Sequence, residues 1–183
     1  MDTAAVQVFT SILSLVTLVG AAVALAAWAL SRRWAPAARA TSMVGEAGLW
    51  LAAIVAIGAT IGSLYFSEVA GFVPCRLCWF QRIAMYPLAP ILLVAAVRRD
   101  RSVGWYVIPL AVIGTAVAGY HSLIEWRPSL EGGACSAFGP SCADIWFREF
   151  GFVTLAFMAL VGFLSIIVFT MLAVRPRQGT ESS

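Results

Sequence analysis

Charged residues are scarce in this sequence of 183 residues: they make up 11% of it, whereas hydrophobic residues make up 61%. A soluble domain contains about 25% charged residues, so the composition excludes a soluble enzyme and indicates a protein that crosses a membrane several times. Lysine is absent, and all twelve basic residues are arginines, most of them at the borders of apolar segments. This distribution, with a net charge of only +3, does not form a phosphate-binding surface, and we expect no nucleic-acid partner.

Five apolar runs dominate the chain, and each is long enough to cross about 30 Å of hydrocarbon, which takes about 20 residues of helix. We therefore predict an all-α membrane protein, with a four-helix transmembrane bundle at 47–175 and one extra N-terminal transmembrane helix. Residues 1–46 would form this N-terminal anchor and a cytoplasmic linker, and residues 176–183 a disordered cytoplasmic tail. Gly58 and Gly62 form a Gly-x-x-x-Gly pattern, which predicts close helix packing. The five predicted helices cover residues 6–30, 47–66, 79–97, 103–123 and 152–174.

The arginines predict how these helices are oriented in the membrane. If five helices alternate, eight arginines fall on the side of the C-terminus and four on the opposite side. Because positive residues accumulate on the cytoplasmic side, the N-terminus is expected outside and the C-terminus inside. The first apolar run is expected to be a retained anchor rather than a signal peptide, since it is too long and no basic residue precedes it.

The four cysteines fall into two pairs, both on the expected outer side, where disulfides persist. Cys75 and Cys78 form a Cys-x-x-Cys turn at the mouth of the third predicted helix. Free backbone N–H groups and the helix dipole favour a thiolate there, and the thiolate is the form that attacks disulfides. Cys135 and Cys142 lie together in the polar loop before the last helix. Two pairs at one face of a membrane suggest a relay of disulfides.

Two further side chains are candidates for this chemistry. Arg82 follows Cys78 by four residues, so the two can share a helix face. A guanidinium there would favour the thiolate form of Cys78 and stabilise negative charge that develops on a bound acceptor. The alternative is an interfacial arginine that extends to the lipid headgroups. His121, the only histidine, lies near the outer end of the fourth helix, where it would hydrogen-bond an acceptor or relay a proton, or serve only as a satisfied helix-end residue.

Four cysteines can also bind zinc, form structural disulfides or attach haem. Zinc is often held by four cysteines, but the six residues between Cys135 and Cys142 fit such a site poorly, and we predict no metal ligands. Static structural bridges are a second alternative, although a Cys75–Cys78 disulfide closes too small a loop to contribute much stability. Covalent haem attachment needs a histidine after the second cysteine, and Trp79 stands there instead.

The segment 74–82, Pro-Cys-Arg-Leu-Cys-Trp-Phe-Gln-Arg, is followed by Ile-Ala-Met-Tyr-Pro. It closely resembles the DsbB family of membrane disulfide-generating enzymes, and within it the Gram-positive BdbC type. The resemblance covers roughly residues 47–175 and includes the cysteine turn with its arginine, the four-helix core and the second cysteine pair. In the vitamin K epoxide reductase relatives the loop pair precedes the Cys-x-x-Cys turn, whereas here it follows, as in DsbB.

The resemblance implies a thiol:quinone oxidoreductase of the bacterial plasma membrane, with a multi-pass topology that places both cysteine pairs outside the cytoplasm. Its cofactor would be ubiquinone or menaquinone, held near the outer membrane edge. Cys78 would be the cysteine next to the quinone, with Cys75 as its disulfide partner. Arg82 would help to hold the quinone, and His121 loosely matches a histidine that neighbours it.

The resemblance also implies a protein partner for the second pair. Cys135 and Cys142 would form the shuttle disulfide, which a reduced DsbA-like thiol oxidase of the thioredoxin fold attacks at Cys135. Cys142 would then attack Cys75 to form a disulfide between the two loops. The same relay run in reverse as a reductase, and a static or metal-binding four-cysteine protein, are the alternatives. Two features depart from the family pattern: the extra first helix and the short spacing of the second pair.

Overall fold

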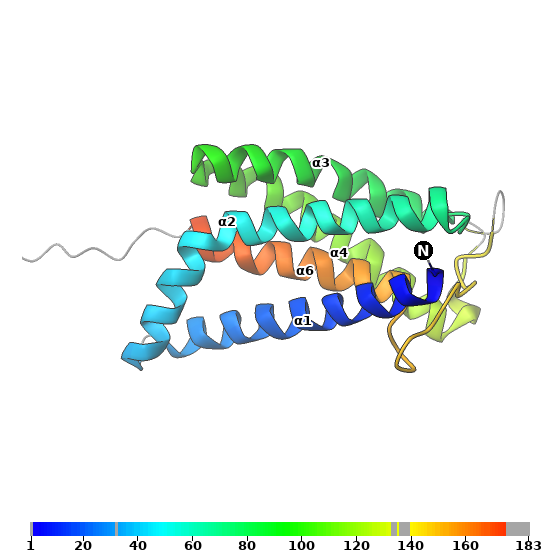
Figure 1. Ribbon diagram of the computed structural model, residues 1–183, viewed down its shortest axis with the longest axis horizontal. Helices are drawn as coiled ribbons and strands as arrows, with labels where there is room; N and C mark the ends of the chain where they lie inside the picture. Colours follow the sequence, from blue (N-terminus) through cyan, green and yellow to red (C-terminus); the bar gives the residue numbers. More distant parts are fainter. Residues whose placement is uncertain (1, 32, 133–134, 136–139, 175–183) are drawn as a thin grey trace, which may run out of the picture.

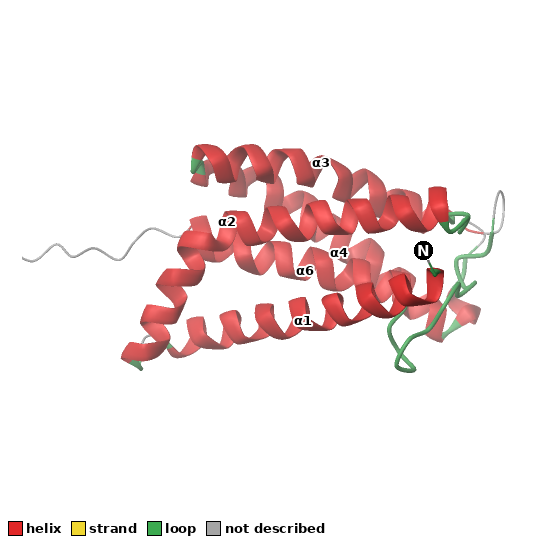
Figure 2. Cartoon of the chain, viewed as in Figure 1, coloured by secondary structure: helices red, strands yellow, loops and turns green. Residues whose placement is uncertain are grey.

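Five long helices make up most of the chain in the computed structural model, which describes residues 2–31, 33–132, 135 and 140–174 (Figures 1 and 2). Each of the five is long and apolar enough to span a membrane. The described part of the chain contains no strand, only one isolated bridge between Glu149 and Val153. The predicted all-α membrane fold with five spanning helices is therefore confirmed, while the predicted tail at 176–183 lies outside the described residues. The helices are α1 (Thr3–Leu30), α2 (Ala35–Leu64), α3 (Arg76–Arg98), α4 (Gly104–Trp126) and α6 (Leu155–Val174).

The second helix differs most from the prediction, because it begins at Ala35 rather than at residue 47. Polar residues interrupt the apolar run before residue 47, so hydropathy alone suggested a linker there. Pro36 stands in the first turn, where its missing N–H costs no hydrogen bond. Figure 1 shows that these first turns run at an angle to the rest of α2. A π-helical turn, Tyr65–Val69, continues α2 at its other end.

Helices α2, α3, α4 and α6 form the four-helix core, and α1 packs against α2 and α6. Close contacts at α6 require glycine on its neighbours. A Cβ atom at Gly48 of α2 would lie 2.6 Å from the carbonyl oxygen of Phe169, and one at Gly114 of α4 would overlap the ring of Phe163. Both glycines let a neighbouring backbone approach α6 closely, as small residues do between membrane helices.

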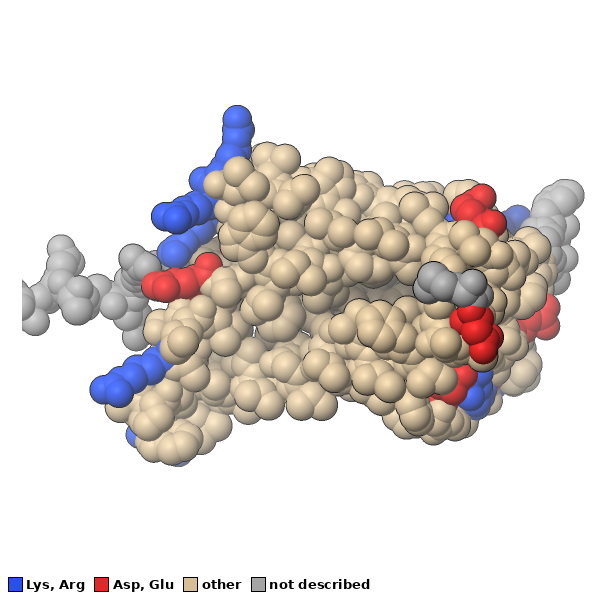
Figure 3. All heavy atoms as spheres, in the orientation of Figure 1, with Lys and Arg blue, Asp and Glu red and all other residues tan. Residues whose placement is uncertain are grey.

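Charged side chains gather at the two ends of the molecule and leave an uncharged belt between them in the view of Figure 3. Large hydrophobic side chains such as Val16, Val19 and Ile54 are exposed along the helices, as expected of a surface that faces lipid. The N-terminus lies at the same end as the cysteine turn and the loop before α6, whereas α3 and α6 end at the opposite side (Figure 1).

Candidate functional site

The Cys-x-x-Cys turn begins α3, and Cys75 itself is the N-cap residue. Pro74 disfavours helical backbone before it, and Cys75 is extended, with φ −71° and ψ 174°. Its sulfur accepts a hydrogen bond from the backbone N–H of Cys78 at 3.3 Å, and the two sulfurs lie 2.9 Å apart without a bond between them. The helix N-terminus therefore acts on the sulfur of Cys75, whereas the prediction had favoured the thiolate at Cys78.

The pKa of the Cys75 thiol lies well below its ordinary value. The largest cause is the hydrogen bond that the Cys78 thiol donates to it, burial works in the opposite direction, and His121 lowers the pKa further. In the reduced pair these contacts favour the thiolate at Cys75. A thiol with a low pKa is also a good leaving group in disulfide exchange.

All four cysteines meet in one buried cluster at the end of the bundle. Cys135 and Cys142 form a disulfide in the loop between α4 and α6 (the disulfide loop). They pack with Cys75, Leu77 and Ile124, and Cys78 borders the same cluster. The side chains of Cys135 and Cys142 are 3% and 1% exposed. The structure thus brings the two cysteine pairs together. The Cys135–Cys142 disulfide is buried from solvent, although it lies in a loop.

His121 lies between the two cysteine pairs. Its Nε2 atom is 3.1 Å from the carbonyl oxygen of Cys142 and 3.7 Å from the sulfur of Cys75. Its Nδ1 atom is 3.1 Å from the side-chain nitrogen of Gln81. A carbonyl oxygen only accepts, so Nε2 carries the proton, and in the neutral ring Nδ1 accepts from the Gln81 amide. Each ring nitrogen is therefore assigned, and the ring connects the cysteine turn to the disulfide loop.

His121 lies beside a small cavity, and its predicted place next to a quinone stays a prediction. The small cavity has a volume of about 20 Å³, and both Cys75 and Cys78 also line it. A larger cavity lies between α1, α2, α3 and α6. Among the described residues Gln81 lines this larger cavity, whereas His121 does not. Gln81 follows Cys78 by three residues and so lies on the same helix face, which is the signal that sequence analysis did not use.

Two carboxylates that sequence analysis did not assign to the site support this arrangement. Glu125, one turn after His121, is buried and accepts a hydrogen bond from the Thr154 hydroxyl at 2.5 Å. Glu131 accepts from the backbone N–H of Cys142 at 2.7 Å and from the Ser141 hydroxyl at 2.6 Å. Glu131 thereby fixes one side of the disulfide loop.

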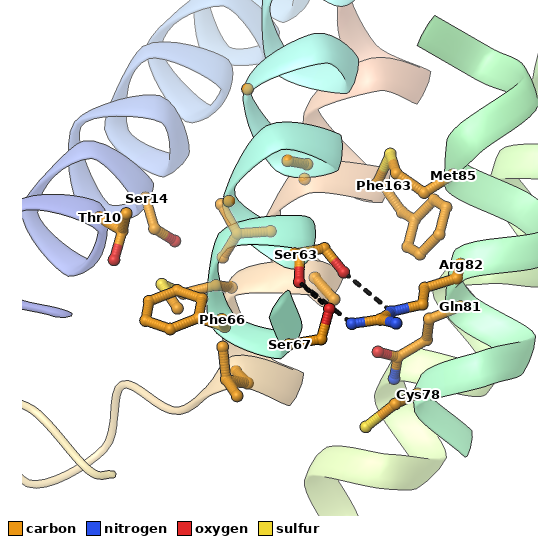
Figure 4. A pocket seen from close by; sticks show the side chains of 18 of the residues that line it. Thr10, Ser14, Ser63, Phe66, Ser67, Cys78, Gln81, Arg82, Met85 and Phe163 are labelled. Atoms are coloured by element: carbon orange, nitrogen blue, oxygen red, sulfur yellow. Dashed lines mark hydrogen bonds between the residues drawn. The ribbon is translucent and has the colours of Figure 1, made fainter. Parts of the chain in front are cut away.

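A cavity of about 240 Å³ lies between α1, α2, α3 and α6, and Cys78, Gln81 and Arg82 stand at its α3 side (Figure 4). Most of the other residues that line it are apolar. Gly58 and Gly62 border the cavity, and a Cβ atom at either would meet nothing within 4 Å. The prediction that these two glycines serve close helix packing is therefore wrong: they leave open space beside α2.

Arg82 is held at the wall of this cavity rather than extended to the membrane surface. Its Nε atom donates to the hydroxyl of Ser63, and its Nη2 atom to the carbonyl oxygen of the same residue, both at 3.1 Å (Figure 4). Tyr86 donates to the Ser63 hydroxyl at 3.2 Å, and the guanidinium lies 5.3 Å from the centre of the Trp79 ring. A guanidinium carries five N–H donors, and Ser63 uses two of them.

Two groups of side chains at the site have the composition of metal ligands. Glu131, Cys135 and Cys142 form one, but two of its sulfurs are joined in the disulfide. Cys75, Cys78 and His121 form the other, with two sulfurs and one nitrogen within 4.8 Å of one another. A closed zinc site takes four ligands, so this group would need a fourth from elsewhere.

Comparison with known proteins identifies relatives of most of the chain. The family described as disulfide bond formation protein DsbB matches residues 45–173. Disulfide bond formation protein C of Bacillus subtilis (strain 168) is 43% identical over 124 residues, which are 68% of this chain and 90% of that protein. A probable disulfide formation protein of Oceanobacillus iheyensis is 43% identical over 136 residues, 73% of this chain and 90% of its own. One from Coxiella burnetii is 38% identical over 125 residues, 68% and 83% of the two chains. No solved structure matches the chain.

Proposed function

The chain belongs to the DsbB family of disulfide bond formation proteins, and from this premise we propose that it is a membrane thiol:quinone oxidoreductase. It would generate disulfides by reoxidising a DsbA-like thiol oxidase outside the cytoplasm. The observation that carries the proposal is the single cluster of four cysteines, with His121 between the pairs and Cys78 at the wall of a cavity inside the bundle.

The relay starts with the Cys75–Cys78 and Cys135–Cys142 pairs both oxidised. A partner thiolate attacks Cys135, the disulfide breaks, and Cys142 leaves as a thiolate that attacks Cys75 and releases Cys78. The second partner thiolate then attacks the partner sulfur of the mixed disulfide, which oxidises both partner sulfurs and releases Cys135 as a thiolate. The Cys135 thiolate attacks Cys142, which re-forms the disulfide of the loop and releases Cys75 as a thiolate. Each exchange forms one S–S bond and breaks another, so two electrons reach the Cys75–Cys78 pair.

The protein assists this last release through the groups around Cys75. The backbone N–H of Cys78 donates to its sulfur, the Nε2 atom of His121 lies 3.7 Å from the same sulfur, and both stabilise a leaving thiolate. His121 also donates to the carbonyl oxygen of Cys142, so it holds the two reacting pairs in one place. Attack on the shielded disulfide requires the loop to open, and the bonds to Glu131 set how readily it does so.

The residues around the larger cavity fit a quinone. The cavity is lined mostly by apolar side chains, borders Cys78 and has N–H donors from Gln81 and Arg82, a combination typical of small-molecule sites. A quinone bound there supplies an acceptor for the two electrons and two protons given up when the Cys75–Cys78 disulfide re-forms. Arg82 offers positive charge at this side of Cys78, where negative charge develops. Ubiquinone and menaquinone both remain candidates.

The low pKa of Cys75 favours the oxidase direction over the reductase alternative. A stabilised thiolate stabilises the reduced pair, and a pair whose reduced form is stabilised is a stronger oxidant. For a two-electron couple, about 30 mV corresponds to about 1.4 kcal/mol. Contacts that stabilise Cys75 therefore help the pair to accept electrons from a strongly oxidising partner.

We further propose a location in the bacterial plasma membrane, with the N-terminus and both cysteine pairs outside and the C-terminus in the cytoplasm. The N-terminus lies at the same end of the molecule as the cysteine cluster (Figure 1). Arg98, Arg99 and Arg101 lie where α3 ends, at the opposite end, as the positive-inside rule expects of the cytoplasmic side. The bundle at 47–175 would carry the relay, with 1–46 as its membrane anchor.

Trapping the first intermediate tests this function. A reduced thioredoxin-fold oxidase whose second reactive cysteine is replaced by serine can attack the Cys135–Cys142 disulfide of the unmodified protein but cannot release itself, so it should accumulate in a mixed disulfide with Cys135 while Cys142 leaves as a thiolate. In the matched Cys135→Ser variant that complex should be absent. A complex that forms only through Cys142 would reverse the order of the relay. A protein that traps no donor through either cysteine, and that retains stoichiometric zinc after purification, would be a metal-binding protein instead.

A further inference from the structure

One buried hydroxyl at the larger cavity, the Oγ atom of Ser14 on α1, has no hydrogen-bond partner among the described residues. Its neighbours on the same face of α1 behave differently. Thr10 donates to the carbonyl oxygen of Val6 and Thr17 to that of Leu13, both at 2.8 Å. Four other buried hydroxyls of the described chain also lack a partner, but Ser14 alone of the five lines the cavity.

Helix α1 forms one whole side of this cavity. Thr10, Ser14 and Thr17 line it, and the spacing of four and three residues places them on one helix face. Figure 4 shows Thr10 and Ser14 on the side of the cavity opposite the α3 residues. The family match begins at residue 45, so α1 is a wall that this chain adds to the matched four-helix region.

An unpartnered hydroxyl inside a membrane protein has no water to bond, and leaving it unsatisfied costs free energy. A hydrocarbon chain in the cavity would not help, since it accepts no hydrogen bond. A quinone ring carries carbonyl oxygens at opposite edges. The donors of Arg82 and Gln81 stand on the α3 side of the cavity and Ser14 on the α1 side, so hydrogen-bond donors face the cavity from two sides.

We propose that Ser14 is a binding residue for the electron acceptor, and that α1 is a wall of the acceptor site as well as a membrane anchor. The Ser14 hydroxyl donates a hydrogen bond to a ring oxygen of the bound quinone. This inference rests on the proposed function and adds to it a residue outside the matched family region.

The test measures quinone binding by the full-length protein in detergent, apart from turnover. Binding of a short-chain ubiquinone and of a short-chain menaquinone is followed by the shift in melting temperature with quinone concentration. Ser14→Ala should weaken the binding of the preferred quinone about three- to tenfold, the loss expected for one neutral hydrogen bond. Ser14→Thr, which keeps the hydroxyl, should bind more tightly than Ser14→Ala. Thiol–disulfide exchange between the donor and the Cys135–Cys142 pair should be unchanged in both variants.

Ser11→Ala is the matched control, because Ser11 is on the same helix and its buried hydroxyl also lacks a partner, but it does not line the cavity. Equal quinone affinity in Ser14→Ala, Ser11→Ala and the unmodified protein would overturn the inference. Gly58→Leu separates this failure from failure of the proposed acceptor site, since it extends a side chain into the cavity from a point on α2 where a Cβ atom meets nothing within 4 Å. If Gly58→Leu abolishes binding and Ser14→Ala does not, only the role of Ser14 is wrong. If neither affects binding, the quinone does not occupy this cavity.

Discussion

The imidazole of His121 donates from Nε2 to the carbonyl oxygen of Cys142 over 3.1 Å, which ties the end of α4 to the disulfide loop. The same nitrogen lies 3.7 Å from the sulfur of Cys75. One side chain thus contacts both residues of the proposed exchange between the pairs, in which Cys142 would attack the sulfur of Cys75. The first expected consequence of these contacts concerns the rate of exchange between the two cysteine pairs.

Replacing His121 with alanine should slow electron transfer from the disulfide loop to the Cys75–Cys78 pair. A small misplacement of reacting groups costs about 100-fold in rate, so we expect kcat to fall by about 10- to 100-fold. The KM for quinone should stay nearly constant, because His121 does not line the larger cavity. Stopped-flow measurement of the inter-loop exchange checks this, with Ser122→Ala as the neighbouring control. A rise in quinone KM with an unchanged exchange rate would return His121 to the acceptor site.

The depressed pKa of Cys75 predicts a pH dependence of the reduced pair. An ordinary thiol titrates near 8.5, whereas the Cys78 thiol and His121 lower the pKa of Cys75 in the fold. The folded, reduced form should therefore gain stability as the pH rises from the lowered value toward about 8.5, and lose it as the pH falls through the lowered value. Thiolate ultraviolet absorbance of a variant without the loop cysteines should titrate well below the ordinary thiol range. Cys78→Ala should shift this transition upward, and a titration at the ordinary thiol value in both proteins would contradict the assignment.

Arg82 should act on acceptor binding rather than on exchange with the donor. Hydrogen bonds to charged groups are worth about 1.5–3 kcal/mol, so Arg82→Ala should raise the quinone KM by about 10- to 100-fold. Ser63→Ala removes the hydroxyl that accepts from its Nε atom and should have a smaller effect in the same direction. Steady-state kinetics with quinone varied checks both, with Arg39→Ala at the opposite end as the control. Unchanged KM values in both variants would remove Arg82 from the acceptor site.

Glu131 should control how readily the disulfide loop opens. Glu131→Ala removes the acceptor for the Cys142 N–H and the Ser141 hydroxyl. The Cys135–Cys142 disulfide, otherwise buried, should then be reduced several-fold faster by a small dithiol, because the loop loses two hydrogen bonds of about 1 kcal/mol or more each. Glu68→Gln, at the same end of the molecule, serves as the control. Equal reduction rates in all three proteins would show that other contacts hold the loop closed.

Hydropathy was sufficient to predict the five spanning helices, and the cysteine turn with the residues around it was sufficient to indicate the DsbB family. The five spans depend on long apolar runs, and the start of α3 follows from Pro74 and the cysteine turn, both local signals. The early start of α2 at Ala35 was missed because polar residues there interrupt the apolar run without ending the helix.

The parts of the site that sequence did not predict depend on contacts between distant segments. His121 meets Cys75 across 46 residues of sequence, and Arg82 meets Ser63 across 19. The packing of α2, α3 and α4 decides which hydrogen-bond donor faces which hydrogen-bond acceptor. The open space beside Gly58 is likewise a property of packing, because the same glycine pattern also serves tightly packed helices.

The central claim is that electrons from a protein dithiol leave through Cys78 to a membrane quinone. Its most direct test mixes the purified full-length protein in detergent with a reduced thioredoxin-fold donor and follows quinone absorbance. The account predicts catalytic quinone reduction with at least one of ubiquinone and menaquinone, and its complete loss in Cys78→Ser. Quinone reduction that persists in Cys78→Ser, or no reduction by the unmodified protein with any donor, would contradict it.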